Sequence, residues 1–164
     1  MDVNMRRRDR EITDPEEFRQ VLEKCEIVHI GMHDGEHIYV LPMNFGYEFE
    51  NDKLVLYVHG SLEGKKWDLV RKNPDVSIEM DCDHYMIEAE KACQYGYAYA
   101  SIMGVGKAEV LDDPAEKVKG LEVLMSGMTG KKFEFNERLA SIVAVMKITL
   151  DSYTGKRRPI KRES

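Results

Sequence analysis

The segment that most constrains the fold is residues 57–74, which read Y-V-H-G-S-L-E-G-K-K-W-D-L-V-R-K-N-P. A β-rich run over residues 54–58 ends in His59 and Gly60, and a helical pattern follows over residues 62–72. The order is therefore strand, tight turn and helix start. Helix N-termini expose unpaired N–H groups and carry partial positive charge, so this turn is suited to an anion, above all phosphate.

The side chains of the turn allow two interpretations. For phosphate binding, Ser61 supplies a hydroxyl, and Lys65 and Lys66 supply positive charge. In the structural alternative, Ser61 only caps the helix and the lysines form a solvated helix face. The segment is not a P-loop, because three residues rather than four separate Gly60 from Gly64 and the lysine is not followed by Ser or Thr.

Length and composition indicate one ordinary globular domain. The 164 residues are 43% hydrophobic and 33% charged, which suits a single domain over residues 1–164 with a core at about 10–153. No apolar run is long enough to cross a bilayer, and no secretory signal opens the chain. The three cysteines have no paired spacing, so we expect reduced thiols in a cytoplasmic protein that does not bind membranes.

Net charge argues against a nucleic-acid partner, since the formal value is −6 at pH 7. Basic residues nevertheless cluster at both ends, and we expect a basic C-terminal tail over residues 154–164. Such ends are usually solvated, and the alternative is that one of them folds over an anionic ligand. The clustered residues are Arg6, Arg7, Arg8 and Arg10 near the start, and Lys156, Arg157, Arg158, Lys161 and Arg162 near the end.

Two further helix starts share one signature. Asp14 and Asp113 are each followed by Pro at the first helical position and Glu at the third, which is typical of a capped N-terminus. Apolar residues then recur with helical spacing, so both helices should pack one face on a larger structure. Those residues are Phe18, Val21, Leu22 and Cys25 in the first helix, and Val118, Leu121, Met125 and Met128 in the second.

The rest of the chain reads as strands joined mostly by hairpins. Residues 83–93 are expected to form a polar loop, and Pro42 suggests an edge or bulge. The fold class is therefore mainly β (α+β), a six-stranded antiparallel split β-barrel with flanking helices. The six expected strands cover residues 27–32, 38–49, 54–58, 76–80, 97–111 and 142–150.

No metal site is expected. His29, His33 and His37 are four residues apart, a spacing that makes a metal-binding face only on a helix, and their flanks look like strands. Cys82, His84 and Cys93 lack a C-x-x-C pair. Among the histidines His59 differs, because it ends a strand beside the turn. It can donate to an anion or transfer a proton, or it can be a hydrogen-bonded structural residue.

Two more stretches carry functional signals. Residues 42–47, P-M-N-F-G-Y, combine an amide, two aromatic rings and a glycine, a mixture that can accept a flat ring against the backbone. Residues 97–109, Y-A-Y-A-S-I-M-G-V-G-K-A-E, place small and hydroxyl-bearing residues on a long strand. Each stretch alone is also compatible with a bulged barrel strand.

In combination these stretches resemble the pyridoxamine 5′-phosphate oxidase-like flavin-binding split-barrel family, and within it the nitroimidazole-resistance (Nim) type branch. The matching motifs are M-N-F-G-Y at 43–47, H-G-S-x-x-G-K-K at 59–66, N-P at 73–74 and Y-x-S-I-x-G-x-G-K-A at 99–108. The resemblance covers nearly the whole chain. It implies a homodimer that binds FMN where the two barrels meet.

The resemblance also implies roles for particular residues. The isoalloxazine would be lined by Met43, Asn44, Phe45, Gly46 and Tyr47. The phosphate turn would comprise His59, Gly60, Ser61, Lys65 and Lys66, with His59 close to the flavin as the catalytic candidate. The other long strand would contribute Tyr99, Ser101 and Ile102.

Two departures from the family pattern bear on function. Ala100 stands where branch members commonly carry Arg, so one ligand contact is missing. The C-terminal tryptophan motif of true pyridoxamine phosphate oxidases is absent, because the only tryptophan is Trp67, and this argues against vitamin B6 oxidation. The expected function is NAD(P)H-dependent reduction of a small acceptor such as a nitroaromatic. The alternatives are a non-enzymatic flavin- or haem-binding module and a deazaflavin-dependent relative.

Overall fold

The structure is a computed structural model that describes residues 5–159. In that part of the chain there are eight strands rather than the six expected, together with four α-helices. The elements, in chain order, are β1 (Glu11–Ile12), α1 (Pro15–Lys24), β2 (Ile27–Asp34), β3 (His37–Asn44), β4 (Gly46–Glu50), β5 (Lys53–Gly60), α2 (Lys65–Lys72), β6 (Asp75–Ile87), β7 (Gly96–Val110), α3 (Pro114–Thr129), α4 (Glu137–Ala140) and β8 (Ala144–Arg158).

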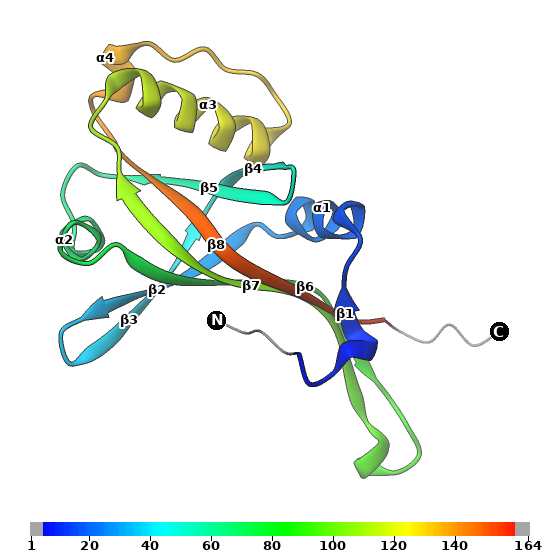
Figure 1. Cartoon of the computed structure of the whole chain (residues 1–164). Helices are drawn as coiled ribbons and strands as arrows, with labels where there is room; N and C mark the ends of the chain where they lie inside the picture. The colour runs from blue at the N-terminus through cyan, green and yellow to red at the C-terminus, as the bar shows by residue number, and fades with distance from the viewer. Residues whose placement is uncertain (1–4, 160–164) are drawn as a thin grey trace.

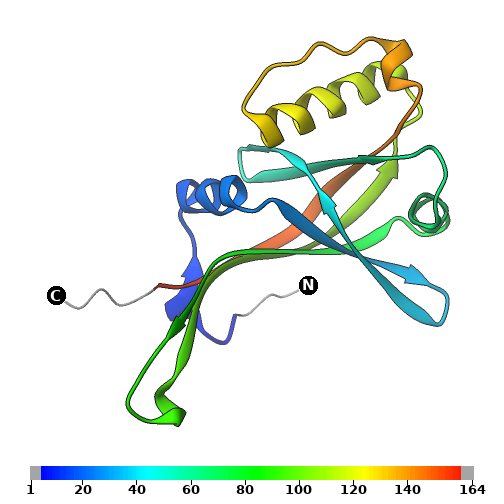
Figure 2. The same ribbon diagram turned by 180° about the vertical axis from the view of Figure 1, so that it is seen from behind.

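The strands form one antiparallel sheet that curls into a barrel. Its order is β3-β2-β6-β7-β8-β5-β4, with the short β1 paired to β8 outside this path. Strands β3 and β4 are therefore at opposite ends of the sheet, yet only Phe45 separates them in the chain. The sheet therefore has to curl until its two edges meet, and Figures 1 and 2 show the curled sheet. The expected antiparallel split barrel is confirmed.

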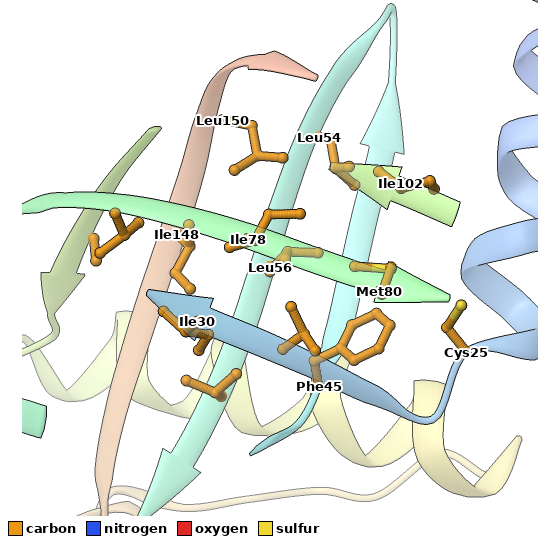
Figure 3. Close-up of a cluster of buried hydrophobic side chains, with 14 of the residues drawn as sticks. Cys25, Ile30, Phe45, Leu54, Leu56, Ile78, Met80, Ile102, Ile148 and Leu150 are labelled. Carbon is orange, nitrogen blue, oxygen red and sulfur yellow. The ribbon is translucent and has the colours of Figure 1, made fainter. Parts of the chain in front are cut away.

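The core fills the inside of this barrel. Ile30, Ile78, Ile102 and Ile148 come from four neighbouring strands, are at most 2% exposed, and lie in one apolar cluster with Phe45 (Figure 3). Strands alternate their side chains between two faces, so every second residue of these strands enters the core. Burial of this apolar surface is the main contribution to the stability of the fold.

Both capped helix starts are confirmed. The carboxylate of Asp14 accepts a hydrogen bond from the backbone N–H of Glu16, and that of Asp113 accepts one from Glu116, each at 3.0 Å. Helix α1 buries Phe18 against the barrel core, and α3 lies over β4 and β5 (Figure 1). Among residues 5–159, no helix is long and apolar enough to cross a membrane.

Two expected strands had the wrong extent. The region 38–49 is two strands, because the chain turns at Phe45 from one edge of the sheet to the other. Strand β6 is longer than residues 76–80, so the expected polar loop over 83–93 is wrong for residues 83–87 and correct only from residue 88 on. This strand stays paired with β7 as far as Ile87, past a register shift between Cys82 and Tyr85. Backbone pairing continues through polar residues here because side chains on the outer face of the sheet need no apolar partner.

The expected C-terminal end of the core, at about residue 153, was also too early. Strand β8 continues to Arg158, with Ile12 of β1 paired opposite Gly155. Residues 154–158 therefore belong to the sheet and not to a tail. Lys161 and Arg162, the last residues of the basic cluster, lie outside the described residues.

Candidate functional site

The turn between β5 and α2 has well-defined geometry. Its first residues end a central strand, with His59 opposite Val145 and Gly60 opposite Ala144 of β8. Ser61 is exposed, and its Oγ donates a hydrogen bond to the backbone oxygen of Glu63 at 2.8 Å. Ser61 therefore does not cap the helix. Helix α2 begins at Lys65, three residues later than expected, because Ser61 and Glu63 form a local turn instead.

Gly64 is the N-cap of α2 and leaves the first turn of the helix open. Its φ is 156°, a backbone conformation that favours glycine, and it has no side chain with which to accept hydrogen bonds from the helix. The first backbone N–H groups of α2 thus have no side-chain cap. Such groups, with the positive end of the helix dipole, bind anions.

Trp67 holds this turn against the end of the barrel. Its ring is 1% exposed, and Nε1 donates a hydrogen bond to the backbone oxygen of Ser61 at 2.8 Å. A Cβ on Gly60 would lie 3.1 Å from the Trp67 ring, so glycine at this position allows the ring to pack closely on the strand. Trp67 was not among the predicted site residues, although Gly60 and Gly64 on both sides of the turn leave room for a large side chain nearby.

The two lysines occupy different surroundings. Lys66 Nζ lies 4.6 Å from the centroid of the Trp67 ring. It also lies close to Gly60, since a Cβ on Gly60 would be 3.4 Å from Lys66 Nζ. Within residues 5–159, no ion pair involves Lys66. Lys65 instead extends toward the β2–β3 hairpin, where its Nζ is 2.5 Å from Asp34 Oδ2 and 4.9 Å from the centroid of the Tyr39 ring. The structure thus leaves Lys66, rather than Lys65, as the cation at the turn.

His59 is half-buried at the end of β5. It faces the same side of the strand as Tyr57, and its partner Val145 belongs to the apolar cluster under α3. Burial lowers the pKa of His59 from its usual 6.5, since water no longer solvates the imidazolium form. The ring is neutral near pH 7 and can donate one hydrogen bond and accept another.

The residues expected to line the isoalloxazine point in different directions. Met43 packs on the barrel core, and Phe45 is part of that core. The Asn44 amide donates a hydrogen bond to the backbone oxygen of Glu26 at 3.2 Å. In the single chain, therefore, the Met43 and Phe45 side chains do not face the β5–α2 turn, and their assignment to a cofactor stays a prediction.

Gly46 and Tyr47 contact the helices instead. A Cβ on Gly46 would be 2.4 Å from the Cα of Leu124, so this glycine allows α3 to pack directly on β4. Tyr47 lines a groove of about 690 Å³ between β4 and α3, together with Arg19 and Ser126. Burial raises the pKa of Tyr47, which keeps its phenol protonated.

The third predicted group, on β7, divides between the two faces of the sheet. Tyr99 and Ser101 are half-buried on the outer face, opposite Arg158 and Lys156 of β8. Ile102 is fully buried in the core. Ala100 is also fully buried, so the position where branch members commonly carry Arg faces the inside of the barrel.

The structure therefore assembles part of the predicted site in one place. His59, Gly60, Ser61 and Lys66 come together at the end of β5, where an open helix N-terminus and a cation are suited to a phosphate group. The remaining predicted residues lie in or against the core, under α3, on the outer face of β7 or, for Asn44 and Lys65, at exposed positions near Glu26 and Asp34. These residues match the family motifs in the sequence, but they do not line one common cavity in a single subunit.

A family model and a solved structure both match most of this chain. The family model described as "Pyridoxamine 5′-phosphate oxidase" matches residues 14–157. A crystal structure of a candidate 5-nitroimidazole antibiotic resistance protein from Bacteroides thetaiotaomicron has a TM-score of 0.76 and 30% identity, over 90% of this chain and 86% of that one. No curated protein matches the chain.

Two more distant structures share the fold. The flavocytochrome Anf3 from Azotobacter vinelandii has a TM-score of 0.77 at 20% identity, over 98% of this chain and 74% of that one. The FAD and haem binding protein from Mycobacterium smegmatis has a TM-score of 0.77 at 16% identity, over 94% of this chain and 76% of that one. At these identities the likeness concerns the fold alone.

Proposed function

The chain belongs to the pyridoxamine 5′-phosphate oxidase family, in the branch that resembles nitroimidazole-resistance proteins, and on this premise we propose that it binds FMN and reduces a small acceptor such as a nitroaromatic. The observation that carries the proposal is the β5–α2 turn, where Lys66 lies beside an uncapped helix N-terminus. Solved structures of the same fold include proteins named for FAD and haem. Their names make a redox cofactor the first class of ligand to test.

The residues at the turn fit the phosphate of FMN. Backbone N–H groups of the first turn of α2 would donate to its oxygens, Ser61 would add a hydroxyl, and Lys66 would add a charge-assisted contact. Gly60 and Gly64 carry no side chain that would fill this space. Lys65 would contribute only long-range charge, because its ammonium group is held by Asp34.

His59 is the residue of this chain that we assign to proton transfer. A bound flavin supplies hydride and electron transfer from a nicotinamide donor to the acceptor. Reduction of a nitro group also consumes protons, and the neutral, half-buried imidazole of His59 is placed beside the phosphate turn. The ring would take up a proton from solvent and, in its imidazolium form, pass that proton to the acceptor or to a bound water molecule, returning to the neutral state.

We also infer that the working unit is a two-fold dimer. The outer face of β3, β2, β6 and β7 exposes large apolar side chains, including Ile38 (64% exposed), Val40 (59%) and Met103 (58%). Large exposed apolar side chains beside polar ones such as His29 and Glu79 are typical of an interface, and a second copy of the chain presents the same face. A dimer formed there would bring Tyr99 and Ser101 of one barrel next to the other subunit.

The first experiment identifies the chromophore and then tests the phosphate contact. We expect a yellow protein that releases FMN on denaturation, whereas a deazaflavin or a haem has a different absorption spectrum. Lys66→Ala should weaken FMN binding by about 1.5–3 kcal/mol, the usual contribution of a hydrogen bond to a charged group. Lys65→Ala is the matched control, since it removes an identical charge one residue away.

Isothermal titration of FMN into the apoprotein gives both affinities. Equal losses in the Lys65 and Lys66 variants would show that only net charge matters, and FMN affinity unchanged in Lys66→Ala would remove the phosphate assignment. A protein that co-purifies with haem and rejects FMN would support the alternative, a haem-binding module.

A further inference from the structure

A second cluster of polar side chains lies on the outer face of the sheet, on strands β2 and β6. His29 is paired directly opposite Glu79, and Asp81 follows two residues later on the same face of β6. Directly opposed residues of an antiparallel pair point to the same side of the sheet. The backbone register therefore places an imidazole and two carboxylates on the same face of neighbouring strands.

The potential ligand atoms of this cluster are close enough to share one ion. One atom each from His29, Glu79 and Asp81 lie within 4.8 Å of one another, and His29 Nδ1 is 3.2 Å from Glu79 Oε2. A tetrahedral ion with bonds of about 2.0–2.2 Å needs ligand atoms roughly 3.3–3.6 Å apart. Small side-chain rotations bring the third ligand to that distance.

The cluster contains a buried nitrogen whose one close contact, with the Glu79 carboxylate, is not a well-formed hydrogen bond. His29 Nδ1 is buried, and within residues 5–159 it has no hydrogen-bond partner, because its contact with Glu79 does not have hydrogen-bond geometry. In the neutral ring that has its proton on Nε2, Nδ1 is an acceptor, and an ionised carboxylate has no proton to give it. A cation would satisfy the nitrogen and would also offset the repulsion between the two neighbouring carboxylates.

A fourth group supports the same centre. His84 Nε2 lies 2.5 Å from Asp81 Oδ2, on the far side of the register shift in β6. Histidine–carboxylate contacts of this kind orient metal ligands from outside the first coordination sphere. In the single chain all four side chains are partly accessible, between 37% and 43% exposed, so an ion can reach them before two copies assemble on this face.

We propose that His29, Glu79 and Asp81 bind a divalent transition-metal ion of the Zn²⁺ class, with His84 orienting Asp81. The donor set of one nitrogen and two carboxylates suits Zn²⁺ or Mn²⁺, whereas Mg²⁺ and Ca²⁺ prefer oxygen ligands alone. With three protein ligands, a tetrahedral ion retains one open position. The site is separate from the β5–α2 turn and does not depend on the proposed flavin.

No local motif indicates this centre. The expected absence of a metal site rested on the spacing of His29, His33 and His37, and the carboxylates that accompany His29 are about fifty residues further along the chain. Only the pairing of β2 with β6 brings Glu79 opposite His29.

The test is a Zn²⁺ titration of tag-free protein, with a chelating dye as competitor. Every variant should carry Cys93→Ser, because the exposed thiol of Cys93 is a competing zinc ligand. We expect one Zn²⁺ per chain, at least about tenfold weaker binding in His29→Ala and in Glu79→Gln, and no displacement by millimolar Mg²⁺. His33→Ala is the matched control, since it removes an exposed histidine from the same strand and face.

A second probe reports on the ligands themselves. Co²⁺ in the site should give visible bands without thiolate charge transfer, and these bands should be lost in Glu79→Gln, a variant that conserves side-chain size. The proposal is overturned if the parent protein binds Zn²⁺ no more tightly than His29→Ala and Glu79→Gln. FMN content, measured on the same samples, shows separately whether the proposed function holds.

Discussion

His59 illustrates how a single position can change the chemistry of a side chain. Its backbone is fixed by pairing with Val145, and its ring is half-buried beside the cluster under α3. Burial lowers its pKa, so the histidine is neutral in the physiological range and can both donate and accept. A histidine at an exposed strand end would be solvated in both protonation states, so the lowered pKa follows from the position of His59 on β5.

His59→Ala should retain FMN while lowering nicotinamide-dependent reduction of a nitroaromatic by about 10²–10⁴-fold, the usual contribution of general acid catalysis. Flavin occupancy and turnover should be measured on the same preparation. Parallel loss of flavin and rate would instead assign His59 to binding, and full activity with full occupancy would leave it without a role in the reaction.

His59 should also contribute to the pH dependence of stability. Its pKa is lower in the folded protein than the 6.5 of the unfolded chain, so between these two values the unfolded chain binds more protons. The free energy of unfolding should therefore fall as pH falls below about 6.5, and this part of the slope should be absent in His59→Gln. Urea denaturation of the two proteins at pH 7.5, 6.5 and 5.5 measures it. Parallel pH profiles would contradict the assigned burial effect.

At the scale of elements, the contact of α3 with the barrel depends on glycine. Gly46 begins β4 at the edge of the sheet, and the backbone of α3 passes directly over it at Leu124. Gly120, on the same helix, lies against the ring of Tyr57. The helix therefore packs as backbone on strand, closer than ordinary side chains permit, and covers one side of β5 beside His59.

Gly46→Ala should destabilise the protein by about 1–3 kcal/mol, because its Cβ would be 2.4 Å from the Leu124 Cα and the helix has to move. Gly31→Ala is the control, since a Cβ there meets its nearest neighbour at 3.7 Å, an ordinary contact. Chemical denaturation gives both free energies of unfolding. An equal, small effect in the two variants would show that α3 is not packed as described.

At the scale of the whole molecule, the barrel has one face without helical cover. Helices α3 and α4 lie over one side of the barrel, near β4 and β5 (Figures 1 and 2). The outer face of β3, β2, β6 and β7 instead exposes Val40 and Met103 to solvent. That face also carries the proposed metal site, so assembly and metal binding concern the same surface.

Light scattering at micromolar concentration should show a dimer, and Val40→Glu should convert it to a monomer, because a buried unpaired charge at the interface costs several kcal/mol. Ile142→Glu is the control, since Ile142 is 66% exposed and lies near α4, away from this face. A parent protein that is monomeric and still binds FMN would remove both the dimer and the shared site.

Much of the local structure could be predicted from the sequence because it depends on residues close together in the chain. The caps at Asp14 and Asp113 need only the next few residues, and the apolar pattern of α1 is local as well. The motif H-G-S-x-x-G-K-K likewise placed a strand, a turn and a helix in the right order, although the helix begins at Lys65. The residues of the turn that we propose as a phosphate site are also close together in the sequence, which is why the motif could be recognised.

Tertiary structure alone decided which distant groups meet. It paired Lys65 with Asp34 and placed Lys66 at the turn beside Trp67. The sequence K-K alone does not distinguish these two lysines. It also placed Glu79 opposite His29, extended β6 through a polar segment, and separated β3 from β4 at Phe45. These results follow from strand register and barrel closure, which are fixed by the sum of many long-range contacts and not by any local pattern.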